Sequence, residues 1–327
     1  MSTRSLALFL LVALLVGCSG GDKPAVTMPE KKLRIAMIPK GTTHEFWKTV
    51  HAGAQEAADE LGVELIWKGP LKEDDRDEQI KVVEQFTLDK VDGICLAPLD
   101  DTALVTYVKG AQSEGIPVVI FDSALKYDDT VSFVATDNFA AGGVAGTEMA
   151  HVLDGKGDVV VLRYSEGSAS TNERENGFIE KAQSAGLKVV SDEQFAGVTV
   201  ESAQKAGENL VSRFKKGDAL GIQGIFCPNE SSAFGMLRAL QDGGMAGKVK
   251  FFGFDSSAKL IEGLNASQIN GLVVQNPRMM GYLTVKAMVD KLKGSSVEKR
   301  IDTGAVLVTK ENIDTEDVKK LLEPPKE

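Results

Sequence analysis

In the stretch Leu33–Trp47, LRIAMIPKGTTHEFW, a β-rich run ends and a helical pattern begins. The opening run LRIAMI is short and β-rich, as in a strand. From Glu45 onward the apolar side chains recur at helical spacing, at Phe46, Val50, Ala54, Ala57 and Leu61. The sequence therefore predicts a strand followed by a helix, the unit from which parallel sheets are built.

This unit repeats along the chain in two series. In the first, strands are expected at 63–67, 93–96, 117–121 and 131–135, and helices at 80–88 and 103–113. In the second, strands are expected at 158–162, 187–190, 224–227 and 249–254, and helices at 138–153, 171–185, 200–214, 230–241 and 259–264. A strand at 271–275, a helix at 279–292 and a strand at 305–309 are expected to follow.

Short apolar strands that alternate with helices require a parallel sheet with helices on both faces. We therefore predict an α/β fold with two similar lobes, each built on a doubly wound parallel sheet. Because ligands of such sheets bind beyond the carboxyl ends of the strands, we expect a ligand cleft between the lobes.

The composition agrees with this prediction. The chain has 327 residues, enough for about two domains, and its 43% hydrophobic and 26% charged residues are ordinary for a globular protein. The net charge is −10, and the sequence has no run rich in Lys and Arg. A nucleic acid is therefore not expected among the partners.

Residues 1–17 predict a signal peptide for export. A short positive start, Met1–Arg4, precedes the apolar run Leu6–Val16, which is too short to cross a bilayer. Leu15-Val16-Gly17-Cys18 resembles the bacterial lipobox, which implies lipidation of Cys18, cleavage before it and anchoring at a membrane. Residues 18–31 would then be a flexible tether. The alternative is an ordinary cleaved signal peptide in which Cys18 is incidental.

The remaining Cys and His residues do not predict a metal or redox site. Cys95 and Cys227 end predicted strands in different halves of the chain, so we expect both to be buried and unpaired. His44, His51 and His151 lack metal-ligand spacing. We expect no metal and no cofactor.

Sequence motifs typical of several enzyme classes are missing. There is no phosphate-binding GxxxxGK[ST] and no GxSxG. Gly142-Gly143-x-x-Gly146 falls inside a predicted helix rather than at a strand-to-helix turn, so it is not a dinucleotide-binding motif. We therefore expect that the protein is not an enzyme.

Eight blocks of sequence, in order, carry a family resemblance. They are IAMIPKGTTHEFW (35–47), DGICLAPLD (92–100), GIPVVIFDS (115–123), VATDN (134–138), GSASTNERENGF (167–178), IFCPNESSAFGMLRAL (225–240), FFGFDS (251–256) and VVQNP (273–277). With these blocks the chain resembles the periplasmic sugar-binding proteins of ABC transporters, of the ribose- and galactose-binding type, in a lipoprotein form. The resemblance spans about Leu33 to Thr309.

The resemblance implies two lobes joined by a three-strand hinge, with crossings near 136–137, 275–276 and 304–305. The N-terminal lobe would hold residues 32–136 and 276–304, and the C-terminal lobe residues 137–275 and 305–327. The resemblance also implies a monomer in the cell envelope, periplasmic or extracytoplasmic, that closes on a sugar-like ligand and delivers it to an ABC permease.

Carried over position by position, the resemblance implies a ligand site. Phe46 and Trp47 match the pair that stacks on the sugar ring. The set that binds hydroxyl groups would be Asp122, Arg174, Asn229, Asp255 and Gln275. Planar groups of this kind can satisfy a sugar hydroxyl with two hydrogen bonds. His44 lies where the family often has Asn.

Three positions depart from the ribose-binding pattern. Ala97 replaces an amide, Ser123 replaces an Arg, and Lys40 replaces a small hydroxyl residue. These changes alter the hydrogen bonds that the pocket offers, so ribose is not inferred as the ligand. Lys40 either pairs with a pocket carboxylate such as Asp122 or binds an anionic group of the ligand.

Structural roles are also open to these residues. Asp122, Asp255 and Asn229 are placed where helix caps occur. Arg174 lies in a helical stretch where an Arg usually faces solvent, and Gln275 lies where a turn is expected.

Structural roles are also expected for the aromatic pair, for the residues near the hinge and for the acidic stretch. One of Phe46 and Trp47 is expected to face the core. Asp137 and Asn138 are expected to cap a helix near the hinge. The acidic stretch Glu73–Glu78 is expected to be a solvated helix start, although in this family a charged outer surface also docks to the permease.

The sequence thus predicts a lipid-anchored solute-binding protein that captures a small sugar or sugar-like solute by lobe closure. An alternative is a sugar-sensing module that presents its ligand to a chemoreceptor or a histidine kinase. The effector domain of a lactose-repressor-type regulator shares the fold, but it would carry DNA-binding helices where this chain has the lipobox. A secreted sugar hydrolase is the enzyme alternative.

Overall fold

The computed structural model describes residues 32–323. The expected signal peptide (1–17), the lipidation residue Cys18 and the tether up to residue 31 lie outside the described residues, as do residues 324–327. The described residues belong to one compact unit of strands and helices. Their two parallel-dominated sheets confirm the predicted α/β fold class.

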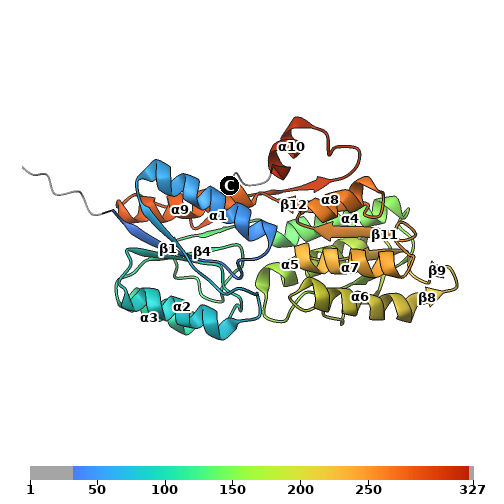
Figure 1. The fold of residues 1–327 in the computed structure, drawn as a ribbon, viewed down its shortest axis with the longest axis horizontal. Helices are drawn as coiled ribbons and strands as arrows, with labels where there is room; N and C mark the ends of the chain where they lie inside the picture. Colours follow the sequence, from blue (N-terminus) through green and yellow to red (C-terminus); the bar gives the residue numbers. More distant parts are fainter. Residues whose placement is uncertain (1–31, 324–327) are drawn as a thin grey trace, which may run out of the picture. The chain divides into compact units, whose positions relative to one another are not determined.

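The first sheet has the strand order β13-β5-β4-β3-β1-β2, and its strands are all parallel. Its strands are β1 (Arg34–Ile38), β2 (Glu64–Trp67), β3 (Gly93–Leu96), β4 (Val118–Phe121), β5 (Phe133–Ala135) and β13 (Arg300–Asp302). Its helices are α1 (Glu45–Leu61), α2 (Arg76–Leu88), α3 (Val105–Ser113) and α9 (Pro277–Leu292). Helices α1 and α9 cover one face of the sheet, and α2 and α3 cover the other (Figure 1).

Strand β1 explains why this sheet is covered on both sides. The side chains of Ile35 and Met37 pack with α1 and α9, whereas those of Ala36 and Ile38 pack with α2 and α3. All four are fully buried. The run is apolar throughout, rather than alternating, because neither face of the strand meets solvent.

The second sheet has the strand order β14-β12-β11-β10-β6-β7 and is parallel except for β14, which runs antiparallel to β12. Its strands are β6 (Asp158–Val161), β7 (Lys188–Ser191), β10 (Gly224–Phe226), β11 (Lys250–Phe254), β12 (Gly271–Gln275) and β14 (Ala305–Val308). Its helices are α4 (Asn138–Val152), α5 (Ala169–Ser184), α6 (Val200–Phe214), α7 (Glu230–Asp242) and α8 (Ala258–Asn265). The first two of these helices pack on one face, and the other three pack on the opposite face.

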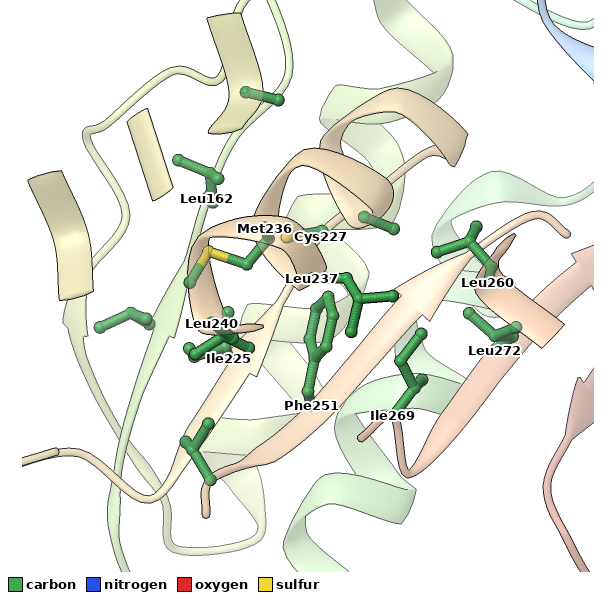
Figure 2. Close-up of a cluster of buried hydrophobic side chains, with 14 of the residues drawn as sticks. Leu162, Ile225, Cys227, Met236, Leu237, Leu240, Phe251, Leu260, Ile269 and Leu272 are labelled. Carbon is green, nitrogen blue, oxygen red and sulfur yellow. The ribbon is translucent and has the colours of Figure 1, made fainter. Parts of the chain in front are cut away.

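Figure 2 shows the apolar cluster between the second sheet and α7. Phe251 of β11 points toward Leu237 and Leu240 of α7, and Ile225 of β10 lies beside them. These side chains are at most 1% exposed. Tight packing of this kind fixes the carboxyl ends of β10 and β11, where the polar residues discussed below begin.

The structure adds elements that the sequence pattern did not predict. Helix α2 begins at Arg76, within the acidic stretch that was expected to start a helix, and the Asp75 side chain caps it by accepting a hydrogen bond from the Glu78 N–H (2.9 Å). The unpredicted elements are β8 (Lys215–Lys216), β9 (Ala219–Leu220), β13 and α10 (Glu316–Leu322). They are short and mostly exposed, so they lack the apolar periodicity that prediction requires.

The chain passes between the two sheets at three places within residues 32–323: from β5 to α4, from β12 to α9, and from β13 to β14. Hydrogen bonds link the first and third crossings, since Thr136 Oγ1 donates to the Gly304 carbonyl (3.0 Å) and Asp302 Oδ1 accepts from the Asp137 N–H (3.1 Å). Gly304 has a φ of 71°, which a Gly adopts without strain. We propose that these crossings form the hinge and bound the two lobes at the residues expected from sequence.

The expectation for the two cysteines of this region is confirmed. Cys95 and Cys227 are free and fully buried, each in the core of a different sheet. None of the helices in the described part of the chain is long and apolar enough to span a bilayer.

Candidate functional site

The carboxyl ends of the strands of both sheets meet at a small cavity of about 20 Å³. All nine residues predicted for the ligand site line it: Lys40, His44, Phe46, Trp47, Asp122, Arg174, Asn229, Asp255 and Gln275. Four further residues complete the lining: Glu73, Ser170, Thr171 and Glu230. A groove of about 780 Å³ adjoins the cavity and shares six lining residues with it: His44, Phe46, Glu73, Glu230, Asp255 and Gln275.

Lys40 follows strand β1 and is 2% exposed. Its Nζ lies 3.4 Å from Asp122 Oδ2 and donates hydrogen bonds to Ser170 Oγ (3.0 Å) and Ser168 Oγ (3.2 Å). Of the two roles expected for Lys40, the structure contains the pairing with Asp122. The two serines belong to the other proposed lobe, so Lys40 also links the walls of the cleft.

Asp122 and Asp255 occupy equivalent places, each directly after a buried strand. Both have a positive φ, 60° and 66°, a backbone conformation that costs free energy in residues other than Gly. Burial raises the pKa of both carboxyl groups; Arg174 opposes this rise at both, and Lys40 opposes it at Asp122. Strained, buried acids of this kind cluster at binding sites.

The capping role weighed for Asp255 is wrong for the helix that follows it. Ser257 caps α8 instead, by accepting a hydrogen bond from the Leu260 N–H. Asp255 Oδ2 accepts from the Glu230 N–H at the start of α7 (3.2 Å), and Oδ1 accepts from Gln275 Nε2 (2.7 Å). Asp255 thus connects two elements at the floor of the cavity.

Arg174 lies on α5 and is 2% exposed, so the solvent-facing role is wrong. Its Nε donates to Asn138 Oδ1 (2.8 Å), its Nη1 donates to the Pro228 carbonyl (3.0 Å), and Nη1 lies 3.8 Å from Asp255 Oδ2. The guanidinium also stacks over the ring of Phe254, 4.0 Å from its centroid. These contacts hold the charge at the cavity wall.

Asp137 and Asn138 have different roles. Asp137 caps α4 by accepting from the Ala140 N–H, as expected from sequence. Asn138 is buried and donates to the Asp122 carbonyl (3.3 Å) besides accepting from Arg174, so it holds two cavity residues in place.

Asn229 and Gln275 supply the amides of the cavity. Asn229 caps α7 by accepting from the Ser232 N–H (3.2 Å), so the expected capping role and its place on the cavity wall coexist. Gln275 ends β12 and is 1% exposed. Among the described residues its Oε1 atom has no hydrogen-bond partner. A buried carbonyl oxygen of this kind is an acceptor that remains available to a ligand.

Phe46 and Trp47 begin α1, and both are at most 8% exposed. Their rings meet edge to face, with centroids 4.9 Å apart, and Trp47 also meets the Phe121 ring edge to face at 6.2 Å. One of the two was expected to face the core. In the structure both pack in the core of the first sheet, and both also line the cavity. Their stacking on a sugar stays a prediction.

Glu73 overturns part of the expectation for the acidic stretch Glu73–Glu78, because its side chain is 8% exposed rather than solvated. Its Oε1 accepts from Trp47 Nε1 (2.7 Å) and lies 3.0 Å from His44 Nδ1. Its Oε2 accepts from the Tyr164 hydroxyl (2.8 Å). The sequence carried no signal for this, since Glu73 opens a run of charged residues that resembles an exposed helix start.

His44 and Glu73 form an ion pair at neutral pH. Burial alone would lower the pKa of His44, but the carboxylates of Glu73, Glu230 and Asp255 outweigh it and raise the pKa to about 9. Burial alone would raise the pKa of Glu73, but His44, Lys40 and the Trp47 hydrogen bond lower it to about 2. His44 is therefore a cation that can donate a hydrogen bond but cannot accept one.

Glu230, which directly follows the predicted site residue Asn229, is a further cavity residue that the sequence pattern did not predict. Its carboxylate reaches across to the start of α1, where it accepts from the N–H groups of Glu45 (3.4 Å) and Phe46 (3.2 Å). A helix amino terminus favours such a charge. Burial nevertheless raises the pKa of Glu230 to about 7, so at neutral pH it is present in both protonation states.

Ser123 and Ala97, two of the three positions that depart from the ribose-binding pattern, make contacts of their own. Ser123 Oγ accepts a hydrogen bond from the Ser170 N–H (3.1 Å), and the Ala97 carbonyl accepts from Gln79 Nε2 (2.8 Å). Neither offers the guanidinium or the amide of the ribose-binding pattern. Across residues 32–323, no group of three or more His, Cys, Asp and Glu side chains is placed to hold a metal ion.

Comparison with known proteins connects this geometry to a family. The model of the periplasmic binding protein domain matches residues 35–296. The ribose import binding protein RbsB of Bacillus subtilis is 26% identical over 308 residues, which cover 93% of this chain and 96% of that protein.

Solved structures agree with these matches. A carbohydrate transporter solute binding protein of Agrobacterium radiobacter, in complex with D-arabinose, is 32% identical, with a TM-score of 0.84 over 89% of this chain and 99% of its own. An ABC transporter solute binding protein of Agrobacterium vitis, with bound D-fucose, is 34% identical, with a TM-score of 0.83 over 89% of this chain and 100% of its own.

Proposed function

We propose, from the premise that this chain belongs to the periplasmic binding protein family, that it captures a small neutral sugar between its two lobes for delivery to an ABC permease. The relatives named above are import and transport proteins for sugars, which supports the ligand class. The nine residues expected from sequence would bind the sugar, together with Glu73 and Glu230.

The charge balance of the cavity carries the proposal of a neutral ligand. Three cations, Lys40, His44 and Arg174, face the carboxyl groups of Glu73, Asp122 and Asp255, and Glu230, which also lines the cavity, adds a fourth carboxyl group that is partly ionised at neutral pH. An ammonium group has three N–H donors, and those of Lys40 are matched by Asp122, Ser168 and Ser170. No cation of the cavity is therefore left over for an anionic ligand, whereas sugar hydroxyls can bond to both kinds of group.

Lobe closure is the proposed mechanism of capture. The cavity of about 20 Å³ holds about one water molecule, whereas pockets for small molecules measure about 300–1,000 Å³. A sugar therefore enters when the lobes separate at the hinge, and the walls then close on it. The ligand shifts the equilibrium toward closure in proportion to its preference for the closed form.

The remaining steps are binding events, with no chemistry on the ligand. We propose that the closed protein docks to the permease subunits as a monomer, and that lipidation of Cys18 holds it at a membrane in the cell envelope. The lipobox-like sequence before Cys18 supports the anchor.

Thermal melting of the purified protein against a panel of sugars tests this function. The panel would contain D-ribose, D-allose, D-arabinose and D-fucose, together with sugar acids, polyols and nucleosides. A ligand at about 100 times its Kd adds about 2.7 kcal/mol to the free energy of unfolding, which is visible as a higher Tm. A shift with a neutral sugar supports the proposal.

Three other outcomes would count against parts of the proposed function. A shift with sugar acids alone would overturn the neutral ligand class and place Lys40 at the ligand. Unchanged melting with every compound, for a folded protein free of carried-over ligand, would contradict sugar binding. Turnover of a sugar conjugate would contradict a purely binding role.

A further inference from the structure

The Glu73 carboxylate is one of the points at which the two walls of the cleft meet. It bonds to His44 and Trp47, which lie on the same wall, and to the Tyr164 hydroxyl, which comes from the opposite wall. Oε1 takes the first two contacts and Oε2 takes the third. Since a carboxylate offers about four lone-pair positions, one on Oε2 remains for a ligand hydroxyl.

Both ends of the Glu73–Tyr164 contact are held rigidly. Tyr164 follows β6 and is 2% exposed, and its backbone N–H donates to Glu175 Oε1 (2.9 Å) while its carbonyl accepts from the Gly197 N–H (3.1 Å). On the other wall, the Glu73 side chain passes over Gly41, where a Cβ would lie 3.0 Å from Glu73 Cγ. A larger residue at position 41 would crowd the Glu73 side chain. Because position 41 is a Gly, the Glu73 side chain has room to reach Tyr164.

We propose that Glu73 is a positioning residue for ligand binding, and that Tyr164 is the residue through which the C-terminal lobe engages it when the cleft closes. This inference rests on the proposed function. Closure brings the Tyr164 hydroxyl onto a carboxylate that already orients the Trp47 indole and the His44 ring. The wall that faces the ligand is thus completed by the same movement that encloses the ligand.

The pairing with Glu73 also affects specificity. With Nδ1 directed at Glu73, the ring of His44 has its Nε2–H left for the ligand, and the imidazolium cannot accept a hydrogen bond. The ligand atom that meets His44 must therefore be an acceptor. The other charged groups near this pair are Lys40, Asp74, Asp122, Glu230 and Asp255. Of all these carboxyl groups, only that of Glu73 pairs directly with the His44 ring among the described residues.

A double-mutant cycle tests the contact between the lobes. Glu73→Gln keeps the size of the side chain and removes its charge, and Tyr164→Phe removes the hydroxyl alone. For the neutral sugar that binds the wild-type protein most tightly, we expect each variant to raise Kd tenfold or more. The rise in Kd of the double variant should be smaller than the product of the two single rises, because both changes weaken the same contact.

Controls separate this result from a general loss of structure. Glu84→Gln, the same substitution at an exposed position of α2, should leave Kd within twofold of the wild type. Conversely, effects of Glu73→Gln and Tyr164→Phe that multiply in the double variant would overturn the coupling, as would a Kd unchanged in either variant.

A second measurement needs no ligand. The chain has three histidines, His44, His51 and His151, so their titrations can be followed individually by NMR in the full-length protein. We expect the pKa of His44 to lie at about 9, and Glu73→Gln to return it toward its ordinary range. A wild-type His44 that titrates in the ordinary range would overturn the positioning role.

The two proposals fail in distinguishable ways. If no neutral sugar binds the wild-type protein, the proposed function fails, while the His44 titration still decides whether Glu73 holds the ring. If a sugar binds and neither Glu73→Gln nor Tyr164→Phe changes Kd, the function stands and this inference fails.

Discussion

The Nζ atom of Lys40 lies 3.4 Å from Oδ2 of Asp122, and the side chains of both residues are almost completely buried, 3% and 4% exposed. Breaking a buried ion pair by removing one partner costs about 3–5 kcal/mol, because the other charge is left without compensation. We therefore expect Lys40→Met to lower the free energy of unfolding by about that amount and to abolish sugar binding. Chemical denaturation and calorimetric titration measure the two effects.

Two variants control this first prediction. Lys81→Met, at an exposed position of α2, should change stability by less than about 0.5 kcal/mol. Lys40→Met combined with Asp122→Asn should recover part of the stability without recovering binding. A single Lys40→Met variant as stable as the wild type would show that the pair contributes little.

The second prediction concerns pH. The pKa of His44 in the folded protein, about 9, lies above its ordinary value of 6.5. The stability that this group contributes is fully present below about pH 6.5 and is lost as the pH rises through 9. We expect the free energy of unfolding to fall by about 3 kcal/mol across this range, measured by denaturation at a series of pH values.

The slope above about pH 7.5 is the informative part. Burial also raises the pKa of Glu175 and Glu230 to about 7, so the stability linked to these carboxyl groups is lost at lower pH, as the pH rises from about 4.5 through 7. His44→Asn should flatten the decline at high pH, whereas His151→Asn, at an exposed position of α4, should not. Equal slopes in the wild type and His44→Asn would refute the assignment to His44.

The third prediction separates binding from stability at Gln275. Gln275→Leu removes the hydrogen bond to Asp255, but it also removes a buried Oε1 atom without a partner among the described residues. An unsatisfied buried acceptor costs about 1–3 kcal/mol, so the two effects largely cancel. We expect stability to change by about 1 kcal/mol or less, while Kd for the sugar rises at least tenfold. Unchanged affinity would show that Oε1 does not bind the ligand.

The fourth prediction connects helix packing to the site. A Cβ at Gly142 of α4 would lie 1.9 Å from the backbone oxygen of Arg174, so Gly142→Ala forces α4 away from α5. Overpacking of this kind costs about 1–3 kcal/mol. Because it displaces Arg174 from Asp255, we also expect weaker sugar binding. Thermal melting and calorimetric titration measure the two effects.

Gly110→Ala is the matched control for Gly142→Ala. Gly110 lies in α3, and an added Cβ would meet nothing within 4 Å. This variant should be neutral or more stable by about 0.5–1 kcal/mol, because Ala favours the helical backbone. Wild-type binding and stability in Gly142→Ala would contradict the account of close helix packing.

The sequence predicts the fold well because the strands are buried on both faces. Runs such as IAMI (35–38) are apolar at every position, and the helices between them show regular apolar spacing, so element type follows from local pattern. Strand β13 (RID) has no such pattern, since two of its three residues are exposed. It joins the first sheet by pairing with β5, a long-range contact that local pattern does not encode.

The candidate site was predictable where polar residues follow apolar strands, as Asp122 and Asp255 do. Glu73 was not, because it lies in a charged loop and becomes buried through contacts with Trp47, His44 and Tyr164. The same holds for Glu230, whose partners are N–H groups at the start of α1. Contacts between segments far apart in sequence require the folded structure.

Calorimetric titration at low and at high salt measures whether the cleft binds a neutral sugar. For the sugar that raises Tm most, we expect one sugar per protein molecule and the same Kd at both salt concentrations, because an uncharged ligand is not screened by ions. Binding restricted to anionic solutes, weakened by salt, would contradict the account, as would the absence of saturable binding to any sugar of the panel.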